Sequence, residues 1–138
     1  MKNTILMLMM IAFSSHISAQ CPTTEIELNT QAEVDAFKVD YPNCTQLLNT
    51  FRIRGNDIVS LDSLHEVTNI DGNLFVWFSP NLTTLSGLDN LTTISGLLTL
   101  LDLGISDISE LAGLTQVGGI TLRTMPQLGS ISPLAGVT

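Results

Sequence analysis

Residues that could carry out chemistry are few and scattered in this sequence. Of its two histidines, His16 lies in the apolar N-terminal stretch and His65 stands alone. No HExxH, CxxC or other metal-ligand spacing occurs, and a Ser/His/Asp triad cannot be assembled around one histidine with confidence. The Gly-Asn and Gly-Gly pairs mark turns, and no phosphate-binding GxxxxGK[ST] loop is present. We therefore predict no catalytic residue, no metal site and no cofactor.

Clustered carboxylates would be the one route to an enzyme, because polysaccharide lyases and hydrolases built from stacked coils gather acidic residues on one face. Asp57 and Asp107 fall at nearby turns, as do Asp62 and Glu110. Aspartate is expected at turns for its hydrogen bonds to the local backbone. We therefore expect a non-enzymatic protein and rank a polysaccharide-acting enzyme only third among the possible functions.

Charge and composition narrow the choice of partners. The 138 residues include 13 acidic and 5 basic ones, for a formal net charge of -8. Charged residues make up only 13%, whereas about 25% is usual in soluble domains. Hydrophobic residues reach 44% and can fill a core. Nucleic acids and anionic membranes need clustered Lys and Arg, so we expect neither as a partner.

The first 20 residues are predicted to be a secretory signal peptide. Lys2 supplies the positive start, residues 5–13 form an apolar run, and residues 14–20 are small or polar. The apolar run is too short for a bilayer, which needs about 20 residues. We expect a secreted or cell-surface protein with no membrane insertion beyond the signal peptide. An uncleaved anchor helix and lipidation of Cys21 are the alternatives.

The two cysteines predict a stapled segment directly after the signal peptide. In an exported chain, Cys21 and Cys44 are expected to be oxidised to one disulfide. The bond would close a loop of about 23 residues, which the chain-entropy model values at roughly 3 kcal/mol. Residues 21–48 are therefore predicted to be a disulfide-stapled N-terminal cap.

The same cap is predicted to contain a short helix. Thr30 and Glu33 fit the capping box S/T-x-x-E, apolar residues follow at helical spacing, and Pro42 closes the segment. We expect the helix to cover about residues 31–41. Its apolar stripe would then lie over the open end of the structure that follows.

From residue 49 onward the chain repeats itself. Three stretches, 49–72, 73–96 and 97–119, follow one another, and a fourth, 120–138, is incomplete. Apolar residues recur at three-residue steps and fall into shared columns: Ile58, Leu82, Ile105, Leu128; Leu61, Leu85, Ile108, Ile131; Leu64, Leu88, Leu111, Leu134; Val67, Leu91, Leu114, Val137; and Ile70, Ile94, Val117. Such a short unit cannot bury its own apolar side, so the columns predict stacking of the units.

The residue types in the repeats favour extended structure over helix. The stretches are rich in Thr, Ser, Asn, Gly and β-branched residues, which are poor helix formers. Short extended pieces joined by tight turns suit these residues better. We predict a mainly β fold, a parallel β-solenoid of leucine-rich coils of about 24 residues with a short N-terminal capping helix.

An alternating triplet in each stretch is predicted to have its outer members in the core and its middle residue in solvent. The triplets are Phe51-Arg52-Ile53, Leu74-Phe75-Val76, Leu98-Thr99-Leu100 and Ile120-Thr121-Leu122. Together with the residue after each triplet, two outward columns result: Arg52, Phe75, Thr99, Thr121; and Arg54, Trp77, Leu101, Arg123.

These outward columns contain the candidate ligand-binding residues. Trp and Arg are enriched in binding hot spots, and Trp77 is the one tryptophan of the sequence. The residues singled out for ligand binding are Arg52, Arg54, Phe75, Trp77, Leu101 and Arg123. An ordinary surface ladder, or a register that places Trp77 inside, is the alternative.

Two motifs resemble the receptor L-domain family, the ligand-binding repeats of the insulin and epidermal growth factor receptors. Cys21-Pro22, a short helix and then Asn43-Cys44 look like the family's N-terminal cap with its disulfide. The run from Gly72 to Val76, followed by the run from Asn81 to Leu88, looks like the family's coil signature. The resemblance covers residues 21–138 and implies a right-handed solenoid that binds partners outside the cell.

A second resemblance competes with the first. Residues 105–114 and 132–136 look like the leucine-rich repeats of bacterial internalin-type adhesins, whose repeats are shorter. The longer spacing and the cysteine-bracketed cap favour the L-domain family, in a bacterial-type secreted member.

We therefore expect an extracellular recognition or adhesion module that binds a protein or glycan through the outward face of its sheet. A structural cell-surface spacer or stalk is the alternative. The last stretch stops in mid-coil at Thr138. We accordingly expect the sequence to be the front part of a longer protein or a truncated gene product.

Overall fold

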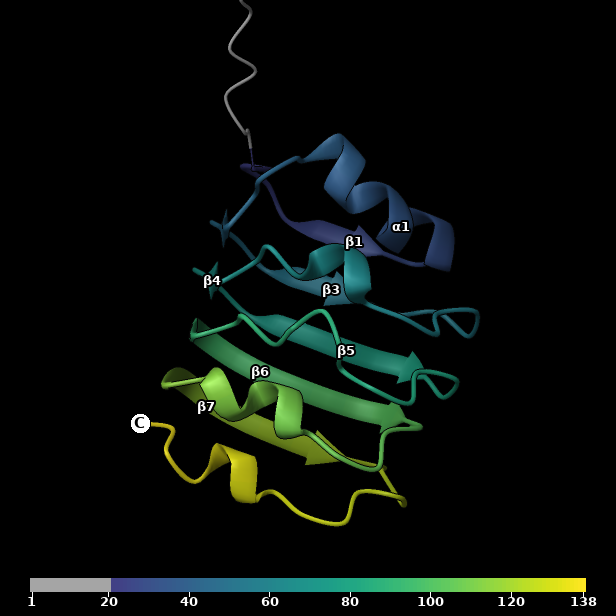
Figure 1. Ribbon diagram of the computed structural model, residues 1–138, viewed down its shortest axis with the longest axis vertical. Coiled ribbons are helices and arrows are strands. Elements are labelled where there is room, and N and C mark those ends of the chain that lie inside the picture. The colour runs from purple at the N-terminus through teal and green to yellow at the C-terminus, as the bar shows by residue number, and fades with distance from the viewer. Residues whose placement is uncertain (1–20) are drawn as a thin grey trace, which may run out of the picture.

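The computed structural model describes residues 21–138 (Figure 1), and the predicted signal peptide of residues 1–20 lies outside the described residues. The fold is mainly β, with one parallel sheet and one α-helix in the described part. In chain order the elements are β1 (Ile26–Leu28), α1 (Gln31–Asp40), β2 (Gln46–Leu47), β3 (Phe51–Ile53), η1 (Asp62–Leu64), β4 (Asn69–Ile70), β5 (Leu74–Ser79), β6 (Thr93–Leu103), η2 (Ser109–Gly113), β7 (Gln116–Arg123) and η3 (Ser132–Leu134), where η denotes a 3₁₀-helix.

The strands pair in parallel, each with the matching strand of the next stretch. Phe51 lies opposite Leu74, Leu74 opposite Leu98, and Leu98 opposite Ile120. In Figure 1, β1, β3, β5, β6 and β7 therefore lie one below another in chain order. The two-residue strands β2 and β4 continue onto the first residues of β6 and form a second, shorter ladder.

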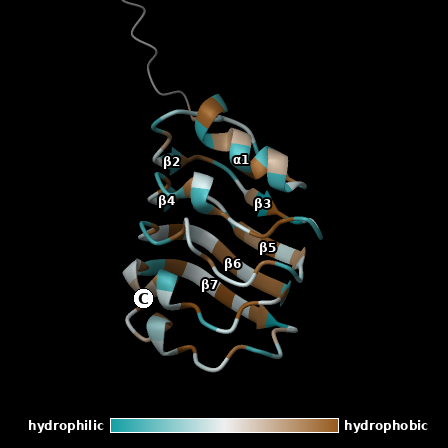
Figure 2. Cartoon of the chain, turned by 45° about the vertical axis from the view of Figure 1, so that its right-hand side comes forward, coloured by the Kyte–Doolittle hydropathy of each residue, from teal (hydrophilic) through white to brown (hydrophobic). Residues whose placement is uncertain are grey.

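Side chains on the inner side of both ladders form one apolar core. The structure buries the predicted columns of the first three stretches, from Ile58 to Leu114, and the outer triplet members of β3, β5 and β6. Figure 2 shows hydrophobic segments recurring at matching places along the successive strands. In the fourth stretch, Leu122, Leu128, Leu134 and Val137 are partly buried against the core, but the prediction is wrong for Ile120 and Ile131, which are 39% and 59% exposed. No strand of the described chain pairs with the far side of β7, so these residues lack a layer to cover them.

Helix α1 begins where the capping box predicts. The hydroxyl of Thr30 accepts a hydrogen bond from the backbone N–H of Glu33 at 3.2 Å, and the Glu33 carboxylate accepts one from the backbone N–H of Asn29. Val34 and Phe37 are buried, and Figure 1 shows α1 beside β1 at the top of the molecule. The helix ends at Asp40, so Tyr41 is its C-cap residue. None of the helices within residues 21–138 has the length and apolar character needed to cross a membrane.

Part of the three-residue step of the apolar columns falls in short 3₁₀-helices, which differ from the predicted extended pieces. The 3₁₀-helices η1, η2 and η3 occupy equivalent places in the first, third and fourth stretches, and the second stretch has a turn there. A 3₁₀-helix has three residues per turn, so side chains three apart lie on one side. Leu61, the N-cap residue of η1, and Leu64, its last residue, lie on one side in this way, and both are fully buried.

The disulfide between Cys21 and Cys44 is confirmed. Their Cα atoms are 5.0 Å apart, and the Cys44 side chain belongs to the core. The bond ties the start of the cap to the turn after α1. It therefore holds the helix and β1 against the first strands of the repeat region.

Replacing both cysteines by serine is expected to lower the free energy of unfolding by about 3 kcal/mol, because the unfolded chain regains the loop-closure entropy. Urea unfolding of the double variant, compared with the oxidised and the reduced parent, measures this. Equal stability of oxidised and reduced parent would contradict the stapling role.

Gly87 is predicted to be the least replaceable glycine. Its φ is +100°, and a Cβ there would lie 2.0 Å from the carbonyl oxygen of Leu61 in the preceding stretch. Gly87→Ala should therefore cost more than about 2 kcal/mol of unfolding free energy, through strain and a steric clash. Gly136→Ala is the matched control, since a Cβ there has nothing within 4 Å. Similar unfolding midpoints for the two variants would show that the stretches are not packed this closely.

Candidate functional site

The strand register brings the predicted binding residues together on the outer side of the sheet. Phe75 lies opposite Arg52 and Thr99, and Trp77 lies opposite Leu101. The outward face, as we use the term, consists of Arg52, Arg54, Phe75, Trp77, Thr99, Leu101, Thr121 and Arg123. Neighbours in it alternate with the buried residues of the same strands, as the pleat of a strand requires. Trp77 is therefore on the outside, although its neighbours cover part of it.

Aromatic rings form the centre of the outward face. The rings of Phe75 and Trp77 are stacked, with centroids 5.1 Å apart and planes 24° apart. Phe78 adds a third ring, 6.2 Å from that of Trp77. The guanidinium group of Arg52 lies 5.5 Å from the centre of the Phe75 ring, within the range of a cation–π contact. These four side chains make one continuous aromatic strip with a cation at its end.

Two ion pairs join the outward face to β1 and to the residue just before it. Arg52 pairs with Glu25, and Arg54 lies 3.9 Å from Glu27. The Arg52 side chain is 25% exposed and is held by both the carboxylate and the ring, whereas the Arg54 side chain is 52% exposed. A solvent-exposed pair at that distance contributes little, about 0–1 kcal/mol. Arg54 is therefore the more available cation of the two.

Sequence reasoning missed Phe78. Its backbone has φ +50°, in the left-handed region, and its side chain is 49% exposed. The matching positions of the next stretches, Asp102 and Thr124, have φ of +56° and +52°. Phe78 and Asp102 lie near the ends of β5 and β6, and Thr124 comes directly after β7, so the same irregularity recurs at the end of these three strands. Asp tolerates this conformation well, whereas bulky residues do not. The available signal was an aromatic residue at a place where the other stretches have turn-forming residues.

Sequence reasoning also missed the acidic partners of the two arginines. Glu25, just before β1, and Glu27, within it, are spaced two apart, as Arg52 and Arg54 are in and just after β3. The parallel pairing of Glu27 with Arg52 places all four on one side of the sheet. Equal spacing of opposite charges in two stretches of alternating residues was the signal for this arrangement.

Three of the carboxylates considered as catalytic candidates, Asp57, Asp62 and Asp107, accept hydrogen bonds within the protein. Asp107 accepts a hydrogen bond from the backbone N–H of Ser109, and Asp57 accepts one from that of Gln31. Hydrogen bonds from Ser86 and, to a smaller extent, Ser60 lower the pKa of Asp62 below its usual 3.8. Asp62 is thus ionised at neutral pH and unsuited to act as a general acid.

The other two residues considered for catalysis, Glu110 and His65, do not lie in a cluster of candidate catalytic side chains. Glu110 accepts a hydrogen bond from the Thr84 hydroxyl. His65 lies in an exposed loop with its Nδ1 2.8 Å from the carbonyl oxygen of Asp62. Among residues 21–138, no three His, Cys, Asp or Glu side chains are grouped so that they could hold a metal ion.

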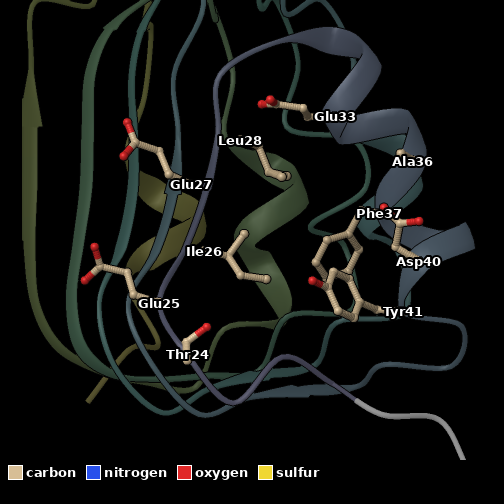
Figure 3. Close-up of a pocket in the computed structure, with 10 residues that line it drawn as sticks. All are labelled: Thr24, Glu25, Ile26, Glu27, Leu28, Glu33, Ala36, Phe37, Asp40 and Tyr41. Atoms are coloured by element: carbon tan, nitrogen blue, oxygen red, sulfur yellow. The ribbon is translucent and has the colours of Figure 1, made fainter.

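A hollow of about 350 Å³ lies between β1 and α1 (Figure 3). Ile26 and Leu28 point toward the helix, while Glu25 and Glu27 point to the other side of the strand. Both glutamates are paired with arginines there, and Glu33 serves the helix cap. The rings of Phe37 and Tyr41 also line the hollow, and their centroids are 5.3 Å apart. Its charged groups are thus largely used within the protein, so the outward face is the stronger candidate site.

Comparison with known families gives one match. A model of the receptor L domain matches residues 43–132, which include all strands of the outward face from β3 to β7. Neither the comparison with curated proteins nor that with solved structures yields a match. The match agrees with the first of the two resemblances in the sequence, and it gives no support to the internalin-type alternative or to a bacterial-type member.

Trp77 gives a direct optical probe of the outward face, because the sequence has one tryptophan. In the native protein, acrylamide should quench its fluorescence to an extent between that of a core tryptophan and that of the unfolded chain. Phe78→Asn should increase the quenching, because the Phe78 ring covers one side of Trp77. Val59→Asn, at another exposed apolar residue, should leave it unchanged. Quenching as weak as that of a core tryptophan would place Trp77 inside.

Proposed function

Because the chain belongs to the receptor L domain family, we propose that it is an extracellular recognition or adhesion module that binds a protein or glycan through its outward face. The family match is the observation that carries the proposal, since receptor L domains are ligand-binding domains and not enzymes. The disulfide fits a location outside the cell, where oxidised cysteines persist.

The composition of the outward face supports its choice as the binding surface. Arg52, Arg54 and Arg123 are three of the five basic residues of an acidic sequence. They flank the stacked rings of Phe75 and Trp77. Trp, Tyr and Arg supply most hot-spot energy in protein interfaces, because they offer large contact areas and several hydrogen bonds. Leu101 extends the apolar part of the surface toward Arg123.

We further infer a right-handed solenoid of coils of about 24 residues behind this face. The domain organisation that goes with it is a signal peptide at 1–20, a stapled cap at 21–48 and repeats at 49–138. The parallel pairing of Phe51 with Leu74, and of Leu74 with Leu98, supports this arrangement. A purely structural spacer is less well supported, since a half-exposed Phe78 beside Trp77 serves no spacing role.

A binding screen of paired variants tests the proposal. The full chain is offered to an array of glycans and to a library of extracellular proteins, together with the double variant Arg54→Ala/Trp77→Ala. We expect the double variant to lose the ligands that the parent binds, with affinities lower by at least about tenfold, because each hot-spot truncation costs more than about 1 kcal/mol.

The control is the double variant Lys38→Ala/Val39→Ala. It also removes one cation and one exposed apolar side chain, but from α1. It should keep every ligand of the parent. Ligands that survive Arg54→Ala/Trp77→Ala and are lost in the helix variant would place the binding surface on the cap and overturn the proposal.

A further inference from the structure

At the end of the outward face lies a hollow of about 400 Å³, lined by Asn29, Arg54, Gly55, Asn56 and Phe78. We propose that this hollow binds a carboxylate-bearing sugar of an acidic glycan. The inference rests on the proposed function, because Arg54 belongs to both the hollow and the outward face. It deepens that function by naming the class of ligand.

Arg54 supplies the charge recognition. Its guanidinium can form two parallel hydrogen bonds with a carboxylate, a geometry that a lysine cannot reproduce. The 3.9 Å separation from Glu27 is at the limit of an ion pair, and the arginine side chain is half exposed. A ligand carboxylate can therefore engage Arg54 without breaking a buried pair. Among the residues lining the hollow, Arg54 is the one charged residue. The Asp57 carboxylate lies close to Gly55, and it already accepts a hydrogen bond from the backbone N–H of Gln31.

Phe78 supplies an aromatic wall, and the fold does not account for its being there. The backbone at this position, near the end of β5, is left-handed, which is unfavourable for a phenylalanine. The side chain is 49% exposed and lies outside the core. An Asp occupies the matching place at 102, where it suits the same turn. Strain of this kind clusters at functional sites, and an exposed ring at the rim of a polar hollow is suited to stack on the C–H face of a sugar.

The rest of the hollow is polar and rigidly built. Gly55 donates its backbone N–H to the Ser79 hydroxyl at 3.1 Å, and the carbonyl oxygen of Asn56 accepts from Asn81 at 2.7 Å. A Cβ on Gly55 would lie 2.2 Å from the carbonyl oxygen of Asn29. Glycine therefore permits the close approach of this turn to the residue that follows β1. Asn29 and Asn56 are exposed, and neither amide side chain takes part in a hydrogen bond within the described chain. Each amide side chain offers both hydrogen-bond donors and an acceptor. They therefore suit sugar hydroxyls, which also donate and accept hydrogen bonds.

A glycan fits the whole arrangement better than an acidic peptide does. A peptide carboxylate would satisfy Arg54, but a peptide offers fewer hydroxyl groups to the two exposed amides and no ring of C–H groups to the face of Phe78. Beyond the hollow, the stacked rings of Phe75 and Trp77 continue the aromatic surface toward a neighbouring sugar. The ligand class is thus a chain of sugars in which at least one carries a carboxylate.

Titration of the full chain with two acidic probes, tetragalacturonic acid and sialyllactose, tests the inference. Uncharged counterparts, the methyl ester of the first and lactose for the second, measure the part played by the carboxylate. We expect at least one acidic probe to bind, and its uncharged counterpart to bind at least about tenfold more weakly.

Three variants locate the binding. Arg54→Gln and Phe78→Asn should each weaken binding at least about tenfold. Phe78→Asn should unfold at the same or a higher temperature than the parent, because Asn accepts the turn conformation, so lost binding is not lost folding. Thr124→Asn makes the equivalent turn substitution in a later stretch and should change binding less than twofold.

The outcomes separate this inference from the proposed function. Equal binding of acidic and uncharged probes, or no binding of either acidic probe at millimolar concentration, overturns the acidic-glycan assignment. So does binding of a glutamate-rich peptide, with no glycan bound, that depends on Arg54. In each of these cases the proposed function stands if Arg54→Ala/Trp77→Ala abolishes the ligands found in the screen. Acidic-glycan binding that is unaffected by that double variant overturns both.

Discussion

The parallel hydrogen-bond register between successive strands is the constraint on which the rest of the structure depends. It sets Leu74 beside Phe51 and Leu98, so residues at matching places in the stretches become continuous columns. Inward columns then form the core, and outward columns form the surface that joins Arg52 to Phe75. Because side chains alternate along a strand, a slip of one residue would exchange the two sets. Fold and candidate site therefore rest on the same pairing.

Much of the fold could be predicted, because the stretches repeat. Columns such as Leu61 and Leu85 showed which residues share an environment, and the structure buries them fully. The spacing alone did not show how the backbone produces the step of three, and the 3₁₀-helices went unpredicted. The triplet pattern alone placed Ile120 in the core, but burial there requires a layer beyond β7, which the described chain does not provide.

The candidate site likewise contains features that could be predicted from the sequence and features that could not. Alternation was enough to place Trp77, within β5, and Arg54, directly after β3, on the outside. Phe78 is the next residue of β5, where a left-handed backbone interrupts the alternation, and a simple in–out pattern cannot describe it. The pairing of Glu25 with Arg52 joins two stretches and becomes visible only with the register of β1. Features fixed by local periodicity were thus predictable, whereas those created at turns and between stretches were not.

Hydroxyl-radical footprinting of the full chain, free and bound to a ligand recovered from the screen, tests the central claim most directly. This claim is that ligands bind on the aromatic part of the outward face. It predicts that oxidation of Trp77 and Phe78 falls severalfold on binding, while that of Tyr41 and Met125, partly exposed elsewhere, stays the same. Unchanged oxidation of Trp77 and Phe78, with protection at Tyr41 or Met125, would contradict it.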